Sequence, residues 1–115
     1  MKRDDLYLRH ILDSIERIES YALVGKEEFF KKSHWHDAAI RNFEVIGEAA
    51  KRLSLEFKQR TAPVPWKNIT GFRDVLIHDY MGVDLEAVWM VIEKDLPTLK
   101  KVVVAALKPD KNYAK

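Results

Sequence analysis

The apolar residues of this chain recur at intervals of three and four positions, which is the spacing of one face of an α-helix. The longest series begins after Asp37 and consists of Ala39, Phe43, Ile46, Ala50, Leu53 and Phe57. Another series predicts an amphipathic helix from about Asp4 to Val24. Its apolar positions are Leu8, Ile11, Ile15, Ile18 and Ala22. Because no segment alternates apolar and polar residues as a half-buried strand does, the chain is expected to be all-α.

Glycine and proline residues mark where these helices are expected to end. Gly25 ends the first helix, and a short helical piece is expected over residues 27–32. Pro63 and Pro65 have no amide donor and restrict the residue before them, so 61–65 is predicted to be a loop.

Further helical regions are expected on the far side of this loop. One extends from Trp66 to about Tyr80, with an interruption or bend near Gly71. The last helix begins after Asp84, whose side chain can cap it, and a kink is expected near Pro97. Principal helices joined by short loops favour an antiparallel four-helix bundle with a possible short extra helix.

Composition places few limits on function. A chain of 115 residues with 47% hydrophobic and 33% charged residues is expected to form one domain over 1–115. The absence of cysteine excludes disulfides, thiolate metal sites and cysteine nucleophiles. No long apolar run or secretory signal is visible, so we expect no membrane span and a cytoplasmic location. A net charge of +2 is too small to indicate nucleic-acid binding by itself.

Small and large residues at several positions leave two interpretations open. The small residues Gly47, Ala49 and Ala50 allow a neighbouring backbone to approach closely, and Trp66, Phe72 and Trp89 are large for a small bundle. Ordinary core packing accounts for each of them singly. Together they also suit a homodimer formed through helix contacts.

Residues 72–80 bring together Arg73, Asp74 and His78, the groups that a metal-free ribonuclease needs. Arginine can clamp a phosphate, histidine can carry a proton, and a carboxylate can orient the histidine. Asp74 and His78 lie four apart and share a helix face, whereas Arg73 and His78 diverge by about 140° around the axis. Two copies of this helix across a two-fold axis would let an Arg73 and a His78 from different chains converge.

The chemistry would need neither a metal nor a cofactor. His78 would take the proton from a ribose 2′-hydroxyl or deliver one to the leaving oxygen, and Arg73 would stabilise the five-coordinate phosphate. Spacing alone favours a simpler interpretation, in which Asp74 and His78 form a surface pair and Arg73 caps another helix. His34 and His36 point in nearly opposite directions on a helix, so no metal site is predicted there.

Several stretches of the sequence resemble one known family. The run from Gly71 to Tyr80 resembles the HEPN signature, an arginine followed by a polar residue and then a histidine, extended by a tyrosine two places on. Four further stretches resemble the HepT branch of that family, namely residues 37–43, 46–50, 64–66 with Ile69, and 83–84 with 88–89. Taken in order, these stretches cover most of the chain.

The resemblance implies an all-helical homodimer that acts as a metal-independent endoribonuclease toxin of a type II/VII-like toxin–antitoxin system. Arg73 and His78 would be catalytic, with Asp74 in support, although the family also admits asparagine at the place of Asp74. RNA would be the substrate. The implied partner is an MNT-type nucleotidyltransferase antitoxin, which in part of the family transfers AMP to the tyrosine that is Tyr80 here. The alternative is a non-catalytic helical partner, or modification target, of that nucleotidyltransferase.

A cluster of charged residues is predicted on the longest helix. Glu44 and Glu48 share a face with Arg41 and Arg52 at the spacing of helical ion pairs, so we interpret them mainly as an ion-pair network. Arg41 and Glu48 fall within the stretches that resemble the HepT branch. One of these two residues is therefore a candidate to line a dimer cleft or to hold Arg73 in place.

Overall fold

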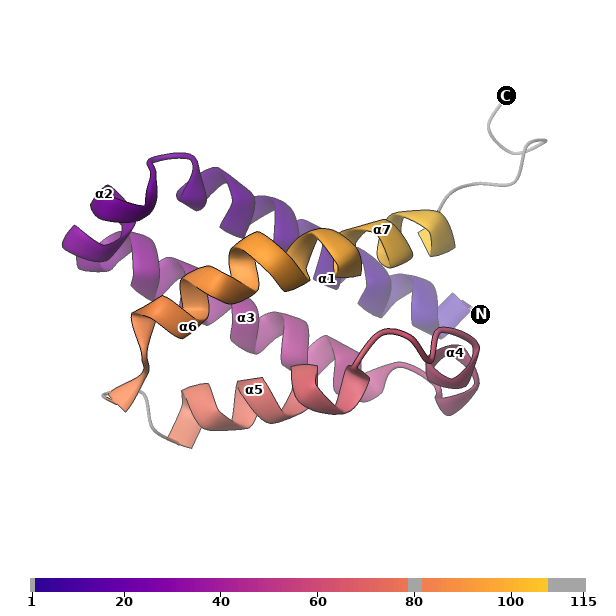
Figure 1. Cartoon of the computed structure of the whole chain (residues 1–115). Coiled ribbons are helices and arrows are strands. Elements are labelled where there is room, and N and C mark those ends of the chain that lie inside the picture. Colours follow the sequence, from indigo (N-terminus) through magenta and orange to yellow (C-terminus); the bar gives the residue numbers. More distant parts are fainter. Residues whose placement is uncertain (1, 79–81, 108–115) are drawn as a thin grey trace, which may run out of the picture.

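The computed structural model describes residues 2–78 and 82–107, and across these ranges it contains helices and no strand (Figure 1). The helices are α1 (Lys2–Ala22), α2 (Lys26–Lys31), α3 (Ser33–Arg52), α4 (Leu55–Arg60), α5 (Trp66–His78), α6 (Leu85–Met90) and α7 (Leu96–Leu107). A π-helical stretch, Val91–Asp95, joins α6 to α7. The predicted all-α class is confirmed. None of the described helices is both long and apolar enough to cross a membrane.

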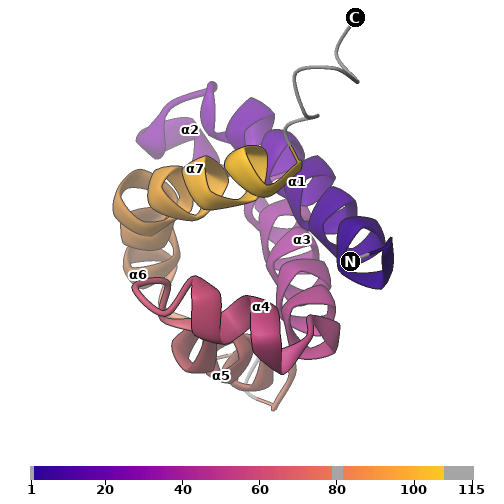
Figure 2. The same cartoon turned by 90° about the vertical axis from the view of Figure 1, so that its right-hand side faces the viewer.

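The helix α3 occupies the middle of the bundle. It packs against α1 on one side and α5 on the other, while α7 lies against α1 (Figures 1 and 2). The short helix α4 turns the chain at one end between α3 and α5. A mainly apolar pocket of about 350 Å³ lies between α5 and α7. The principal neighbour of α5 is therefore α3 and not α7.

The core is built from the residues that the helical periodicity singled out. Those of α1 and α3 that are buried include Leu8, Ile11, Ile15, Ile18, Ala39, Phe43, Ile46 and Ala50. Burial of these side chains removes apolar surface from water, and this is the main source of stability for a helix bundle of this kind.

The long helix does not continue to Phe57 as its periodicity predicted. It ends at Arg52, and Ser54 caps α4 by accepting a hydrogen bond from the Phe57 amide at 3.1 Å. The amide and hydroxyl of Ser54 in turn donate to the buried carboxylate of Asp4, at 2.8 and 2.7 Å. Leu53 and Phe57 are both buried on either side of the break, so the apolar pattern runs through it unchanged.

The second half of the chain differs from expectation in two places. The helix α5 runs through Gly71 without interruption. A kink was expected near Pro97, and the structure has a π-helical stretch just before this residue. Proline has no amide donor and its ring crowds the preceding turn, so regular α-helical hydrogen bonding is disturbed there. Asp84 caps α6 as predicted, accepting from the Glu86 amide at 3.0 Å.

The residues that suggested a homodimer are largely used within one chain. Trp66 and Trp89 are only 7% and 8% exposed, and Ala49 and Ala50 are buried. Phe72 is partly buried, with its ring against Phe43. Their size therefore does not require a second chain, and homodimerisation stays a prediction.

Candidate functional site

The position of Arg73 depends on the absence of a side chain at Gly47. The helix α5 lies so close to α3 that a Cβ built on Gly47 would overlap the Cβ of Arg73. Arg73 therefore lies along the surface of α3, with 22% of its side chain exposed.

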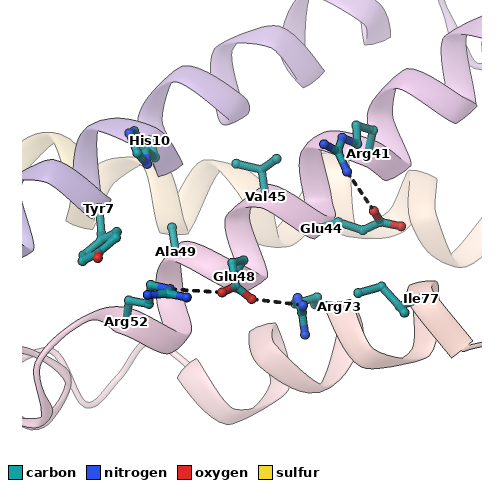
Figure 3. A pocket seen from close by; sticks show the side chains of 10 residues that line it. All are labelled: Tyr7, His10, Arg41, Glu44, Val45, Glu48, Ala49, Arg52, Arg73 and Ile77. Carbon is teal, nitrogen blue, oxygen red and sulfur yellow. Dashed lines mark hydrogen bonds and ion pairs between the residues drawn. The ribbon is translucent and has the colours of Figure 1, made fainter.

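Arg73 lies in a row of charged side chains, in which Glu48 stands between Arg52 and Arg73 (Figure 3). The two carboxylate oxygens of Glu48 lie 3.0 Å from Arg52 Nε and 3.0 Å from Arg73 Nη2. On its other side Arg73 contacts Asp74, with Nη1 3.2 Å from the carboxylate. The hydrogen bond from Arg52, helped by the charge of Arg73, lowers the pKa of Glu48, so this carboxylate is ionised at neutral pH.

His78 is the last residue of α5 and is exposed. Asp74 forms its ion pair with Arg73, and within the described ranges no hydrogen bond joins Asp74 to His78. Ile77 lines the groove beside Arg73, whereas His78 does not. Within one chain His78 therefore does not line the groove that Arg73 lines. Tyr80 lies outside the described residues.

The groove beside Arg73 has a volume of about 400 Å³ and lies between α1, α3 and α5 (Figure 3). Its lining consists of Tyr7, His10, Arg41, Glu44, Val45, Glu48, Ala49, Arg52, Arg73 and Ile77. The predicted ion-pair network is present here, since Arg41 Nη1 also lies 3.7 Å from Glu44.

Sequence reasoning missed Tyr7 and His10, which α1 contributes to the groove. The two rings meet edge to face with centroids 6.2 Å apart. Their three-residue spacing was a visible signal of proximity on one helix, but nothing in the sequence placed that helix beside Arg73. Among the residues described, no group of three histidine or acidic side chains is arranged to hold a metal ion.

Comparison with known proteins agrees with the resemblance noted in the sequence. The family model described as "Ribonuclease HepT-like" matches residues 11–106. A protein of Methanocaldococcus jannaschii named "Gamma-glutamylcyclotransferase and putative RNase" is 44% identical over an alignment of 115 positions, which covers 97% of this chain and 52% of that protein. The chain thus spans about half the length of that relative.

Other relatives match over nearly their whole length. A "Putative RNase" of Caldanaerobacter subterraneus is 42% identical over 112 residues, covering 96% of this chain and 100% of that protein. A "Probable ribonuclease HepT" of Thermococcus cleftensis is 38% identical over 95 residues, covering 82% of this chain and 86% of that protein. No solved structure shows a significant match.

Proposed function

Because the chain belongs to the ribonuclease HepT-like family, we propose that it is an endoribonuclease that cleaves RNA without a metal ion. The observation that carries the proposal is the placement of Arg73. Glu48 holds its guanidinium at the edge of a groove, and part of the side chain remains open to a ligand. A guanidinium fixed in this way can bind a phosphate with little further loss of side-chain freedom.

The proposed reaction is an attack of the ribose 2′-oxygen on the adjacent phosphorus. The new bond closes a 2′,3′-cyclic phosphate while the bond from phosphorus to the 5′-oxygen breaks. His78 carries out one of the two proton transfers, from the 2′-hydroxyl or to the departing 5′-oxygen, and solvent water carries out the other. Arg73 stabilises the charge that builds up on the phosphate oxygens in between.

A homodimer would place these two groups together. In one chain Arg73 faces the groove while His78 does not, so the complete site takes Arg73 from one protomer and His78 from its partner. Supporting this, α5 packs mainly against α3 and exposes the apolar side chains of Val75 and Ile77. Light scattering should give the mass of a dimer, and a monomer at assay concentrations would contradict the shared site.

The regulatory part of the proposal concerns a nucleotidyltransferase antitoxin that transfers AMP to Tyr80. Tyr80 follows His78 by two residues, so an AMP group there would bring negative charge and bulk close to the site. Incubation with that partner and ATP should add the mass of one AMP, and Tyr80→Phe should abolish the addition. A label on a different residue would refute Tyr80 as the acceptor.

The other candidate function is that of a non-catalytic partner of the nucleotidyltransferase. It is favoured by the engagement of Arg73 with two carboxylates, Glu48 and Asp74, which compete with any phosphate for its donors. The two functions differ in whether the purified chain cleaves RNA.

The deciding experiment is RNA cleavage in EDTA by the wild type, Arg73→Ala and His78→Ala. Both variants should lose activity by about two orders of magnitude or more, as expected when a transition-state contact or a proton carrier is removed. His34→Ala and Arg17→Ala are matched controls, because both side chains are exposed and lie outside the groove. Circular dichroism checks that each variant is folded. Undiminished cleavage by His78→Ala would overturn the assigned mechanism.

A further inference from the structure

Arg52 and Arg73 approach one carboxylate from different helices. Arg52 belongs to α3 and Arg73 to α5, and Glu48 lies between them with an oxygen 3.0 Å from each. Both arginines line the same groove (Figure 3). Because both guanidiniums contact the same carboxylate, they lie close enough together to bind two neighbouring groups of one ligand.

Arg52 has hydrogen-bonding capacity left over. A guanidinium has five N–H donors, and Arg52 uses Nε for Glu48. Its side chain is 58% exposed. Glu48, together with the hydroxyl of Tyr7, raises the pKa of Arg52. As an arginine, this residue is positively charged in any case. In the described part of the chain, Glu48 is the acidic side chain that pairs with Arg52.

The charges along this row are uneven. Glu48 offsets one of its two arginines, and the second carboxylate, Asp74, contacts Arg73 at the far end. Arg41 is paired with Glu44 elsewhere in the groove. These paired charges sum to zero, but Arg52 at one end of the row contacts Glu48, whereas Asp74 lies at the other end beside Arg73. The Arg52 end is therefore the more positive end of the row, which favours an anion there.

We propose that Arg52 forms a second phosphate subsite, which binds the phosphate next to the one held by Arg73 in a single strand of RNA. The proposal rests on the ribonuclease function, because it takes Arg73 as the residue at the scissile phosphate. Successive phosphates are separated by one ribose, so two guanidiniums held by the same carboxylate can each contact one of them.

The aromatic wall of the groove distinguishes RNA from a free phosphate ion. Tyr7 and His10 lie on α1 and both line the groove, and the Tyr7 hydroxyl is close to Arg52. A base attached to the second phosphate meets these rings, and stacking on an aromatic side chain stabilises any base irrespective of its identity. The subsite therefore adds affinity for single-stranded RNA without adding sequence preference.

The test compares Arg52→Gln with Lys51→Gln on two substrates. Lys51 is the adjacent exposed residue, carries the same charge and does not line the groove. One substrate is a dinucleotide with a single phosphate, and the other is an oligonucleotide with the same step flanked by further phosphates. Arg52→Gln should raise KM for the oligonucleotide about tenfold, as for loss of a charged hydrogen bond, with kcat retained. The change for the dinucleotide should be much smaller, and Lys51→Gln should affect neither substrate.

Salt dependence gives an independent readout. Removal of one phosphate contact should reduce the slope of log affinity against log salt by about 0.7 for a single strand. Arg52→Lys should restore part of the oligonucleotide KM, because the charge returns without the planar donor pair. Equal losses of kcat/KM on both substrates would overturn the subsite, since Arg52 would then act through Glu48 on Arg73.

Binding of an uncleavable 2′-O-methyl oligonucleotide, measured by fluorescence anisotropy, separates the two proposals. If the wild type cleaves neither substrate, the ribonuclease function fails, but weaker binding by Arg52→Gln than by Lys51→Gln still supports the subsite. Equal binding by the two variants would exclude it.

Discussion

The substitution Gly47→Ala tests how closely α5 must approach α3. Alanine is better than glycine in a helix interior by about 0.5–1 kcal/mol, so in the absence of a clash the change would stabilise α3. In the structure, however, the added Cβ would overlap the backbone-proximal part of the Arg73 side chain. The nearest atom is the Cβ of Arg73, which is attached to the backbone of α5 and cannot move unless the helix moves.

The expected size follows from these opposing effects. Overpacking a well-filled contact costs about 1–3 kcal/mol, because side chains leave their rotamers or helices separate. After the gain in helix propensity is subtracted, Gly47→Ala should lower the free energy of unfolding by roughly 0.5–2 kcal/mol. Separation of α5 from α3 would also lengthen the Glu48–Arg73 ion pair, so RNA cleavage should fall as well.

Gly71→Ala is the matched control. Gly71 lies in α5 and is exposed, and apart from its chain neighbours and its own helix backbone no atom lies within 4 Å of an added Cβ. The same chemical change should therefore stabilise the protein by about 0.5–1 kcal/mol. Urea unfolding followed by circular dichroism measures both. If Gly47→Ala stabilises the chain as much as Gly71→Ala does, the close approach of α3 and α5 is refuted.

Other substitutions test the packing and the charges. Asp4→Ala should cost about 1–3 kcal/mol in urea unfolding, because it leaves the Ser54 donors without their partner, whereas Asp13→Ala on the exposed face of α1 should cost little. Leu76→Ala should cost about 2–5 kcal/mol and Leu6→Ala under about 0.5, because Leu76 is fully buried and Leu6 is exposed. Arg52 lowers the folded-state pKa of Glu48, so the stabilising contribution of this carboxylate is complete above its unfolded pKa and disappears as the pH falls through the folded value. Glu48→Gln should therefore make stability less sensitive to pH below about 4.5, by a small amount because the side chain is 41% exposed, and an unchanged pH profile of urea midpoints would contradict this.

The helices were predictable because burial follows their own periodicity. Ile11, Ile15 and Ile18 are buried, as their spacing on one face of α1 indicated. The end of α3 was not predictable in this way. It depends on a hydrogen bond between Ser54 and Asp4, which are 50 residues apart, and the apolar spacing of Leu53 and Phe57 is the same with or without the break.

The choice of Arg73 and His78 as catalytic residues stays a prediction, and the contacts that Arg73 makes could not be predicted from the sequence. Helical spacing allowed Asp74 to contact His78, yet the guanidinium of Arg73 lies next to Asp74 and is bonded to it instead. Glu48 was a candidate to hold Arg73, but only the crossing of α3 and α5 brings their atoms to 3.0 Å. Such contacts between helices depend on packing geometry, which a single sequence does not encode locally.

The attachment of α5 chiefly to α3 has a consequence for hydrogen exchange. A helix with one principal neighbour, separated from α7 by an apolar pocket, can detach while α1 and α3 remain packed. Its amides should then exchange through a partial opening that requires less free energy than global unfolding, and those of α1 and α3 should exchange last. Anything that covers α5, whether a second protomer, an antitoxin or RNA, would slow exchange in that helix first. Hydrogen exchange of the α5 amides can thus show whether a partner is bound to the helix that carries Arg73 and His78, without an activity assay.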